Sequence, residues 1–241
     1  MHAKFHRLLF QRLCGALIAL VLSPATLFAE TSTYDVTTNG FHFGNLMVTT
    51  TLVADTYSIA VTAQAEGLMG FLTQSRYQGS ANGKMTISGP QPAFFAARTQ
   101  RIFKDRETTI SFTNGRPTEV TLTPQKDHTD FTDPESVTDK RLDSLSYFYQ
   151  MFTAPAGKCP ANGTLYDGRR LTEVSFETPT ISDTTTSCIG EYRLINGPDH
   201  SLQSGQRSYA LVFDYAPGGG APVRITVKSG RNLVVLSVVD K

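Results

Sequence analysis

Tryptophan is absent from this sequence of 241 residues, and cysteine occurs three times. Phenylalanine and tyrosine must therefore supply the aromatic bulk of any core. Charge of one sign is also lacking, because 22 Lys and Arg face 21 Asp and Glu. Since phosphate contacts require a concentrated basic surface, this balance argues against a protein that binds nucleic acid.

Long apolar runs are missing except near the amino terminus, where one extends from Leu13 to Leu22. Three basic residues and no acidic ones precede it, and small residues follow at Ala25 and Ala29. This order is typical of a secretory signal. We expect residues 1–29 to be removed by cleavage after Ala29, with cleavage after Ala25 as the alternative. A membrane anchor is the other interpretation, although the run is about half of the roughly 20 residues that a spanning helix needs.

Removal of the signal changes the formal charge from +1 to −2, because 19 Lys and Arg then face 21 Asp and Glu. Cys159 and Cys188 are the cysteines that stay. In an oxidising compartment two cysteines usually pair, and this loop of about 30 residues would add roughly 3.6 kcal/mol of stability. A redox-active pair is the alternative, but neither cysteine lies in a Cys-x-x-Cys motif.

Short strands and turns dominate the rest of the chain. Tyr57, Ile59 and Val61 share one face of a segment whose other face carries Ser58 and Thr62, and Val223 and Ile225 alternate with polar residues in the same way. Turn dipeptides of the Asn-Gly or Asp-Gly type separate such segments, at 39–40, 82–83, 114–115, 162–163, 167–168 and 196–197. Hairpin turns favour these dipeptides, because they tolerate positive φ. The pattern predicts a mainly β protein with one large curved antiparallel sheet, a β-spiral or open barrel, forming a single domain over residues 30–241.

One segment has helical spacing instead. Apolar residues recur through 143–152, Asp143 suits the N-cap, and Pro155 prevents continuation. We expect one short amphipathic helix near 143–152, packed on the concave side or at an end of the curved sheet.

Chemical motifs are scarce. His42, His128 and His200 are far apart without a second ligand at close spacing, so no metal site is expected. Neither a nucleophile motif nor a phosphate-binding glycine loop occurs, and we expect no cofactor. A basic cluster comprises Arg98, Arg101, Lys104 and Arg106. We interpret it as the solvated face and tip of a hairpin, with a contact to an anionic lipid or glycan as the alternative.

Two apolar groups are candidates for ligand or partner contacts. The segment Gly67–Leu72 is apolar on every side, and it either plugs one end of a barrel or forms a lip around a cavity. Its candidate residues are Leu68, Met69, Phe71 and Leu72. The second group shares one face of a predicted strand and consists of Tyr209, Phe213 and Tyr215.

The cysteine region resembles a known family. Cys159 is followed by Leu165-Tyr166-Asp167-Gly168-Arg169-Arg170, Cys188 opens a Cys-x-Gly-x-Tyr motif, and Asp143-Ser144-Leu145 begins a helix. This combination resembles the bacterial exported family called "domain of unknown function 3108", although Ser144 stands where proline is expected. The resemblance implies a periplasmic protein of Gram-negative bacteria with a curved sheet around a helix. It is similar to envelope-integrity proteins and to the periplasmic carriers of lipoproteins, and no catalytic residue is recognised for the family.

Together these features favour a non-enzymatic periplasmic protein in cell-envelope maintenance. It would bind an acyl chain, a lipoprotein or a peptidoglycan-associated partner on the concave face of the sheet. A purely structural interaction module with a filled interior is one alternative. A hydrolase whose triad assembles from distant residues is another.

Overall fold

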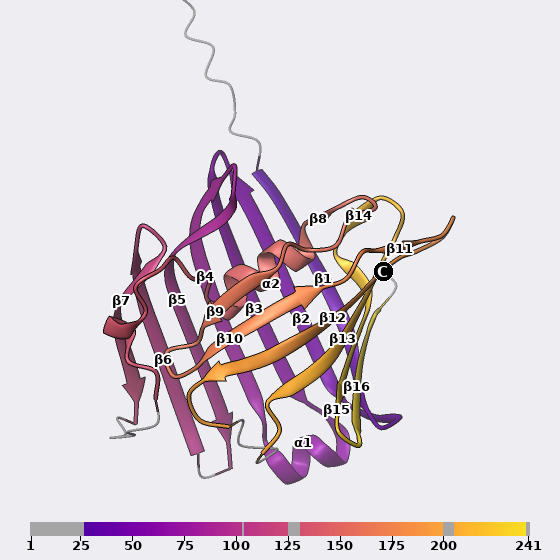
Figure 1. Cartoon of the computed structure of the whole chain (residues 1–241). Coiled ribbons are helices and arrows are strands. Elements are labelled where there is room, and N and C mark those ends of the chain that lie inside the picture. The colour runs from indigo at the N-terminus through magenta and orange to yellow at the C-terminus, as the bar shows by residue number, and fades with distance from the viewer. Residues whose placement is uncertain (1–26, 103, 125–130, 200–204, 240–241) are drawn as a thin grey trace, which may run out of the picture.

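The computed structural model describes residues 27–102, 104–124, 131–199 and 205–239, which form one large sheet around a short helix (Figure 1). The strands are β1 (Leu27–Thr38), β2 (Phe41–Val53), β3 (Thr56–Ala65), β4 (Arg76–Thr86), β5 (Gly89–Arg101), β6 (Lys104–Thr113), β7 (Arg116–Thr123), β8 (Ala154–Pro155), β9 (Gly163–Tyr166), β10 (Leu171–Phe176), β11 (Thr180–Ile181), β12 (Thr186–Asn196), β13 (Ser208–Tyr215), β14 (Gly219–Gly220), β15 (Pro222–Ser229) and β16 (Asn232–Val238). The helices are α1 (Gly67–Thr73) and α2 (Ser144–Phe152), with a 3-10 turn η1 (Pro134–Ser136). None of the described helices is long and apolar enough to cross a membrane.

The sheet is antiparallel throughout and almost closes on itself. Its strand order is β7-β6-β5-β4-β3-β2-β1-β16-β15-β13-β12-β10-β9, with β11 beside β12. The first strand and the last are hydrogen-bonded neighbours, with Tyr34 opposite Val238. One seam separates β7 from β9 (Figure 1). The predicted mainly β, open-barrel fold with a short helix is thus confirmed. The predicted signal segment lies largely outside the described residues, and cleavage after Ala29 would remove the first three residues of β1.

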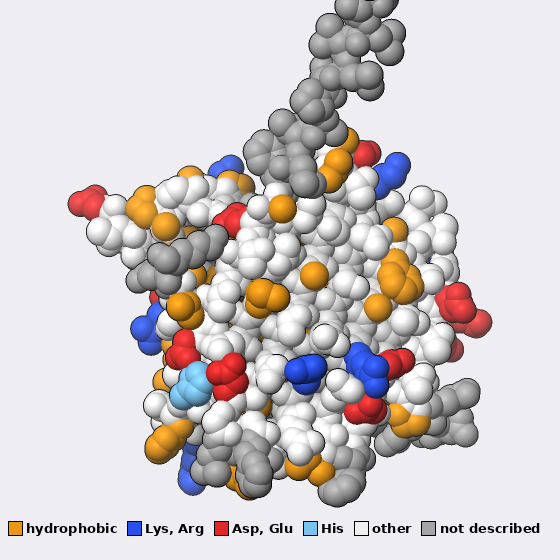
Figure 2. Space-filling view, turned by 180° about the vertical axis from the view of Figure 1, so that it is seen from behind, with side chains coloured by type: hydrophobic (Ala, Val, Ile, Leu, Met, Phe, Trp, Pro, Cys, Tyr) orange, Lys and Arg blue, Asp and Glu red, His pale blue; other side chains and the backbone are white. Residues whose placement is uncertain are grey.

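Strand alternation directs the larger side chains inward. Tyr57, Ile59 and Val61 of β3 are buried and alternate with exposed Ser58 and Ala60. Side chains at alternate positions of a strand point to opposite faces, so one face of each strand lines the barrel interior. The outer face of β1–β7 carries mainly small polar side chains, with a band of charged groups across it (Figure 2).

The turn dipeptides have two different roles in the structure. Asn39-Gly40 and Asn114-Gly115 have positive φ and connect β1 to β2 and β6 to β7, as predicted. Asn82-Gly83, however, lies within β4 at a register shift, which corrects the predicted turn. A Cβ at Gly83 would lie 2.1 Å from the carbonyl oxygen of Gln91, so glycine is required there by the close approach of β5. The 162–163 dipeptide leads directly into β9 rather than forming a hairpin.

The predicted helix is confirmed as α2, and it lies inside the barrel (Figure 1). Its N-cap is Asp143, whose carboxylate accepts hydrogen bonds from the backbone N–H groups of Leu145 and Ser146 at 2.9 and 2.8 Å. The buried residues of α2 lie on more than one side of the helix: Leu145, Ser146, Tyr147, Tyr149, Met151 and Phe152. A helix buried on several sides is expected for one enclosed by a sheet.

Tyrosine replaces the missing tryptophan as the large side chain of the core. Five tyrosines are almost fully buried: Tyr34, Tyr57, Tyr147, Tyr166 and Tyr215. The hydroxyl groups of these tyrosines each have a protein hydrogen-bond partner, at 2.6 to 3.1 Å. A buried hydroxyl without a partner would cost free energy, so each of these groups is paired. The bonds join distant parts of the chain.

The Leu-Tyr-Asp-Gly-Arg-Arg motif holds the seam. The Tyr166 hydroxyl donates to the carbonyl of Thr132 at 2.9 Å, which ties β9 to the segment that precedes α2. Asp167 accepts from the backbone N–H of Arg170, whose guanidinium in turn donates to the carbonyl of Pro198 at 2.8 Å. The motif therefore connects three separate segments of the chain. This structural role accounts for its residues without a catalytic or binding role.

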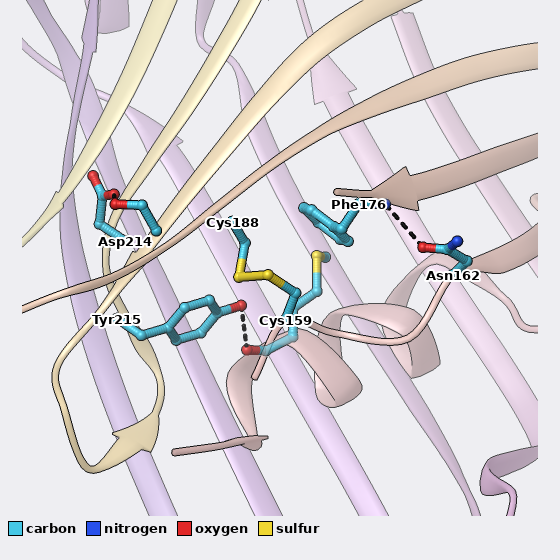
Figure 3. Close-up of a disulfide and its surroundings, with 8 residues drawn as sticks. Cys159, Asn162, Phe176, Cys188, Asp214 and Tyr215 are labelled. Atoms are coloured by element: carbon cyan, nitrogen blue, oxygen red, sulfur yellow. Dashed lines mark hydrogen bonds between the residues drawn. A yellow bond between two sulfur atoms is a disulfide. The ribbon is translucent and has the colours of Figure 1, made fainter. Parts of the chain in front are cut away.

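A disulfide joins Cys159 to Cys188, with 5.5 Å between the Cα atoms (Figure 3). Cys159 lies in the segment that follows α2, and Cys188 is a fully buried residue of β12. Beside it, the hydroxyl of Tyr215 donates to the carbonyl of Met151 at 3.1 Å. The end of the inner helix is therefore attached to the sheet both covalently and by a hydrogen bond.

Candidate functional site

A polar groove of about 650 Å³ opens at the end of the barrel that carries α1. We call it the rim groove. Its polar and charged lining comes from β3, the α1 region, β4, β5 and β6, and includes Gln64, Glu66, Arg76, Gln100, Arg101 and Asp105. The backbone of α1 at Gly67 and Gly70 forms one wall.

Glycines allow α1 to pack at this end. Gly67 opens the helix with φ +56, and a Cβ at Gly70 would lie 2.6 Å from the carbonyl oxygen of Ala65. Gln74 then ends the helix in a left-handed conformation, with its N–H bonded to the carbonyl of Gly70. The sequence did not predict a helix here. The segment forms a short helix beside the groove, and its role as a plug or a lip stays a prediction.

Fixed charges and amide groups define the chemistry of the rim groove. The Arg76 guanidinium donates to the Gln64 side-chain oxygen at 3.0 Å. Asp105 accepts from Arg98 at 2.9 Å, and this hydrogen bond holds the pKa of the Asp105 carboxyl below its ordinary value. Asp105 is therefore an anion at neutral pH and not a proton acceptor of catalytic strength. The groove is suited to hydrogen bonding and ion pairing with a polar ligand.

His42 lies on the outer face beside the groove. Its Nδ1 is 2.6 Å from a carboxylate oxygen of Asp35, and its Nε2 is 3.6 Å from one of Glu66. Figure 2 shows the histidine between two acidic side chains. Within the described part of the chain, no cluster of three or more His, Cys, Asp or Glu side chains could hold a metal ion.

A second polar group lies inside the barrel. The Ser146 hydroxyl contacts both the Asp143 carboxylate and the Tyr57 hydroxyl, the latter at 2.6 Å. Burial raises the pKa of Asp143 to about 6, although its hydrogen bonds to Ser146 and Leu145 act in the opposite direction. Asp143 and Ser146 have no exposed surface. A substrate cannot reach these groups, so we assign them to capping of α2 rather than to catalysis.

The structure separates the residues that the sequence singled out. The backbones of Leu68, Met69 and Phe71 lie in α1, but their side chains are outside the described part of the structure, whereas the side chain of Leu72 is exposed. On β13, Phe213 and Tyr215 are buried in the core. Tyr209 is half-buried, and its ring lies against Tyr192 with 5.6 Å between the ring centroids. The two candidate groups therefore do not form one site.

The amide residues of the rim groove were not identified from the sequence. Gln64 and Gln100 each occupy an outward position of an ordinary alternating strand, and nothing local distinguishes them. The basic cluster identified from the sequence pointed to one residue of the groove, because Arg101 is part of the groove lining. Arg98 of the same cluster instead pairs with Asp105 and Glu107.

Comparisons with known proteins identify a family and a fold. A family model described as "Protein of unknown function (DUF3108)" matches residues 33–196. No curated protein matches the chain. Among solved structures, the chain is similar to a beta-barrel-like protein of domain of unknown function DUF1849 from Brucella abortus. That likeness has 13% sequence identity and a TM-score of 0.51, and it covers 90% of this chain and 98% of the other. At this identity the match concerns the fold alone.

Proposed function

Since the chain belongs to the DUF3108 family of proteins of unknown function, we propose that it is a non-enzymatic protein of the bacterial cell envelope that binds a polar partner in the rim groove. The observation that carries this proposal is the packing of the barrel interior. Helix α2 and the buried aromatic side chains of the strands occupy the concave side of the sheet. A protein with such a core acts most simply through its surface.

The chemistry of the groove supports a polar partner. Side-chain amides at Gln64, Gln74 and Gln100 can both donate and accept hydrogen bonds, and Arg101 adds a cation. Such a lining complements a segment that carries hydroxyl, amide and carboxylate groups. A lipoprotein or a peptidoglycan-associated protein would offer such a segment.

Export to the periplasm is part of the proposal. It is supported by the basic and apolar amino-terminal segment and by the pairing of Cys159 with Cys188, which an oxidising compartment favours. Fractionation of cells would place the protein, and its amino-terminal residue would identify the cleavage site.

Genetic complementation tests the envelope role and the groove together. We expect a strain without this gene to be hypersensitive to detergent, and the wild-type gene to restore resistance. The variant Gln64→Ala/Gln100→Ala removes two groove amides without changing the charge, and it should fail to restore resistance. The matched variant Gln78→Ala/Asn82→Ala removes two exposed amides from the outer face of β4 and should restore it.

Full resistance with the groove variant, at equal protein level, would contradict the role of the groove. Normal resistance of the deletion strain would contradict the envelope role. Thermal melting of the purified variants separates either outcome from misfolding.

A further inference from the structure

We propose that Arg106 and Arg169 form a binding site for an oxyanion, the carboxylate or phosphate group of a small ligand, at the seam of the barrel. The two arginines come from opposite sides of the seam. Arg106 lies in β6, and Arg169 lies in the turn between β9 and β10. Neither residue lines the rim groove, so this site is separate from the proposed function.

The packing of the β9–β10 turn brings the two arginines together. A Cβ on Gly168 would lie 3.0 Å from Thr108 and 3.2 Å from Val120, so the turn touches β6 and β7. Arg106 comes two residues before Thr108 on the same strand, and its side chain therefore points to the same face. Arg169 directly follows Gly168, and the two guanidinium groups are close enough for their charges to interact.

Positive charge is in surplus at this point of the seam. Burial and the like charges of Arg106 and Arg170 lower the pKa of the Arg169 guanidinium, whereas Asp167 acts in the opposite direction. Arg170 and Asp167 are paired with each other at 3.1 Å, so together they add no net charge. Among the described residues, neither Arg106 nor Arg169 has an ion-pair partner.

The other carboxylates near these arginines have other partners. Asp105 and Glu107 flank Arg106 along β6, so they lie on the opposite face of the strand. There they pair with Arg98 at 2.9 and 3.3 Å. The carboxylate of Asp133 accepts the hydrogen bond that caps η1, at 2.9 Å. An oxyanion from solution would therefore supply a counter-charge that these side chains do not.

Burial distinguishes Arg106 and Arg169 from the other unpaired arginines. Both are half-buried. A half-buried guanidinium attracts an anion more strongly than an exposed one, because water and salt screen its charge less. The other described arginines without an ion pair are all exposed: Arg76, Arg101, Arg116, Arg224 and Arg231.

Unused hydrogen-bonding groups accompany the charge. The Arg169 guanidinium lies over the Phe131 ring, 5.4 Å from its centroid, which occupies one face and leaves the edge for hydrogen bonds. Its Nε and the Thr132 Oγ1 are buried, and neither has a hydrogen-bond partner in the described part of the protein. Thr132 is 4% exposed, and its N–H donates to the Arg169 carbonyl at 2.9 Å. A water molecule would satisfy such atoms without balancing the charge, whereas an oxyanion does both.

Titration calorimetry of the purified, disulfide-bonded protein tests the site with two probes, sodium phosphate and sodium succinate. Sodium chloride keeps the ionic strength constant. We expect one anion to bind per protein, and the probe that binds identifies a phosphate or a carboxylate ligand. Arg106→Gln should weaken this binding at least about tenfold, and Thr132→Val about fivefold. The matched variant Arg116→Gln removes an exposed arginine at the β6–β7 turn and should bind like the wild type.

Thermal melting and nuclear magnetic resonance separate the site from misfolding and from binding elsewhere. Without a probe, Arg106→Gln should melt at a higher temperature than the wild type, because it removes the repulsion between two cations. The probe should raise the melting temperature of the wild type more than that of the variant, and it should shift the Nε–H resonance of Arg169.

No binding of either probe at constant ionic strength would overturn the proposal. Equal weakening in Arg116→Gln would also overturn it, and so would binding that leaves the Arg169 resonance unchanged.

Discussion

Asp143 is a carboxyl group with no exposed surface, and its position shows how single residues organise this interior. It caps α2, contacts the Ser146 hydroxyl and lies close to the Tyr57–Ser146 hydrogen bond. The sequence predicted the capping role correctly, since Asp before an apolar helical pattern is a common N-cap. Burial of the cap could not be predicted from the same pattern, because it depends on the sheet that encloses the helix.

Replacement of this carboxyl should change how stability depends on pH. Burial raises the pKa of Asp143 to about 6 in the folded protein, so the folded state holds the proton more tightly than the unfolded state does. The contribution of this group to stability is thus highest near pH 4 and falls by about 3 kcal/mol as the pH rises through 6. Asp143→Asn keeps an acceptor for the cap and removes this titration.

Urea unfolding of both proteins between pH 4 and pH 7 checks this expectation. The free energy of unfolding of the wild type, relative to that of Asp143→Asn, should decrease with rising pH. A difference that is constant over this range would show that Asp143 is already ionised well below pH 4.

Gly168 offers a second test at the residue scale. It has φ +85, and an added Cβ would lie 3.0 Å from Thr108 and 3.2 Å from Val120. Gly40 has a similar φ of +83 with open space around it. Gly168→Ala and Gly40→Ala should both cost about 1 kcal/mol of backbone strain, and Gly168→Ala about 1 to 3 kcal/mol more from overpacking of the seam. Equal melting temperatures of the two variants would contradict the packing role.

At the scale of secondary structure, prediction succeeded where one pattern persists over several residues. Tyr57 to Val61 alternate cleanly, and the 143–152 segment has clear helical spacing, so β3 and α2 were both identified. Gly67–Thr73 is too short and too uniformly apolar for a period to emerge, and its helix depends on packing at Gly70. Asn82-Gly83 has the composition of a turn, but Gly83 is required by the close approach of β5. This requirement depends on the partner strand, so the sequence of β4 alone does not indicate it.

Among the features that connect secondary-structure elements, the disulfide is the one whose loss is easiest to measure. Cys159→Ser/Cys188→Ser should lower the free energy of unfolding by roughly 3.6 kcal/mol, because the unfolded chain gains freedom. The segment 154–162, between α2 and β9, should become sensitive to proteases. Reductant should destabilise the wild type and leave the double variant unchanged. Equal melting of the wild type with and without reductant would show that the bridge adds no stability.

At the scale of the whole molecule, a near-closed sheet surrounds a core rich in tyrosine. The general architecture followed from the density of turns and alternating strands. The rim groove did not, because its lining residues come from β3, β4, β5, β6 and the α1 region and meet only after the sheet curls. The packing of the barrel interior also depends on the position of α2 within the sheet. The alternating patterns of the strands do not specify that position.

Alkaline titration tests the density of this core. Burial raises the pKa of all nine tyrosines above their ordinary value. The folded state therefore holds these protons more tightly, and the stability they contribute is lost as the pH rises above about 10. Ultraviolet absorbance of tyrosinate should appear together with loss of the near-ultraviolet circular dichroism. Ionisation of several tyrosines while the dichroism stays native would contradict a tightly packed interior.

Native mass spectrometry of the protein isolated from cells tests the central claim, that binding occurs at the surface and not in the interior, most directly. Helix α2 and buried aromatic side chains occupy the concave side of the sheet, and the proposed function therefore places the partner in the rim groove rather than in the interior. We predict the mass of the disulfide-bonded chain alone, with no bound lipid and no added mass after incubation with fatty acid or lipopeptide. A stoichiometric acyl ligand that is retained through purification would contradict the account and would support a carrier of hydrophobic ligands.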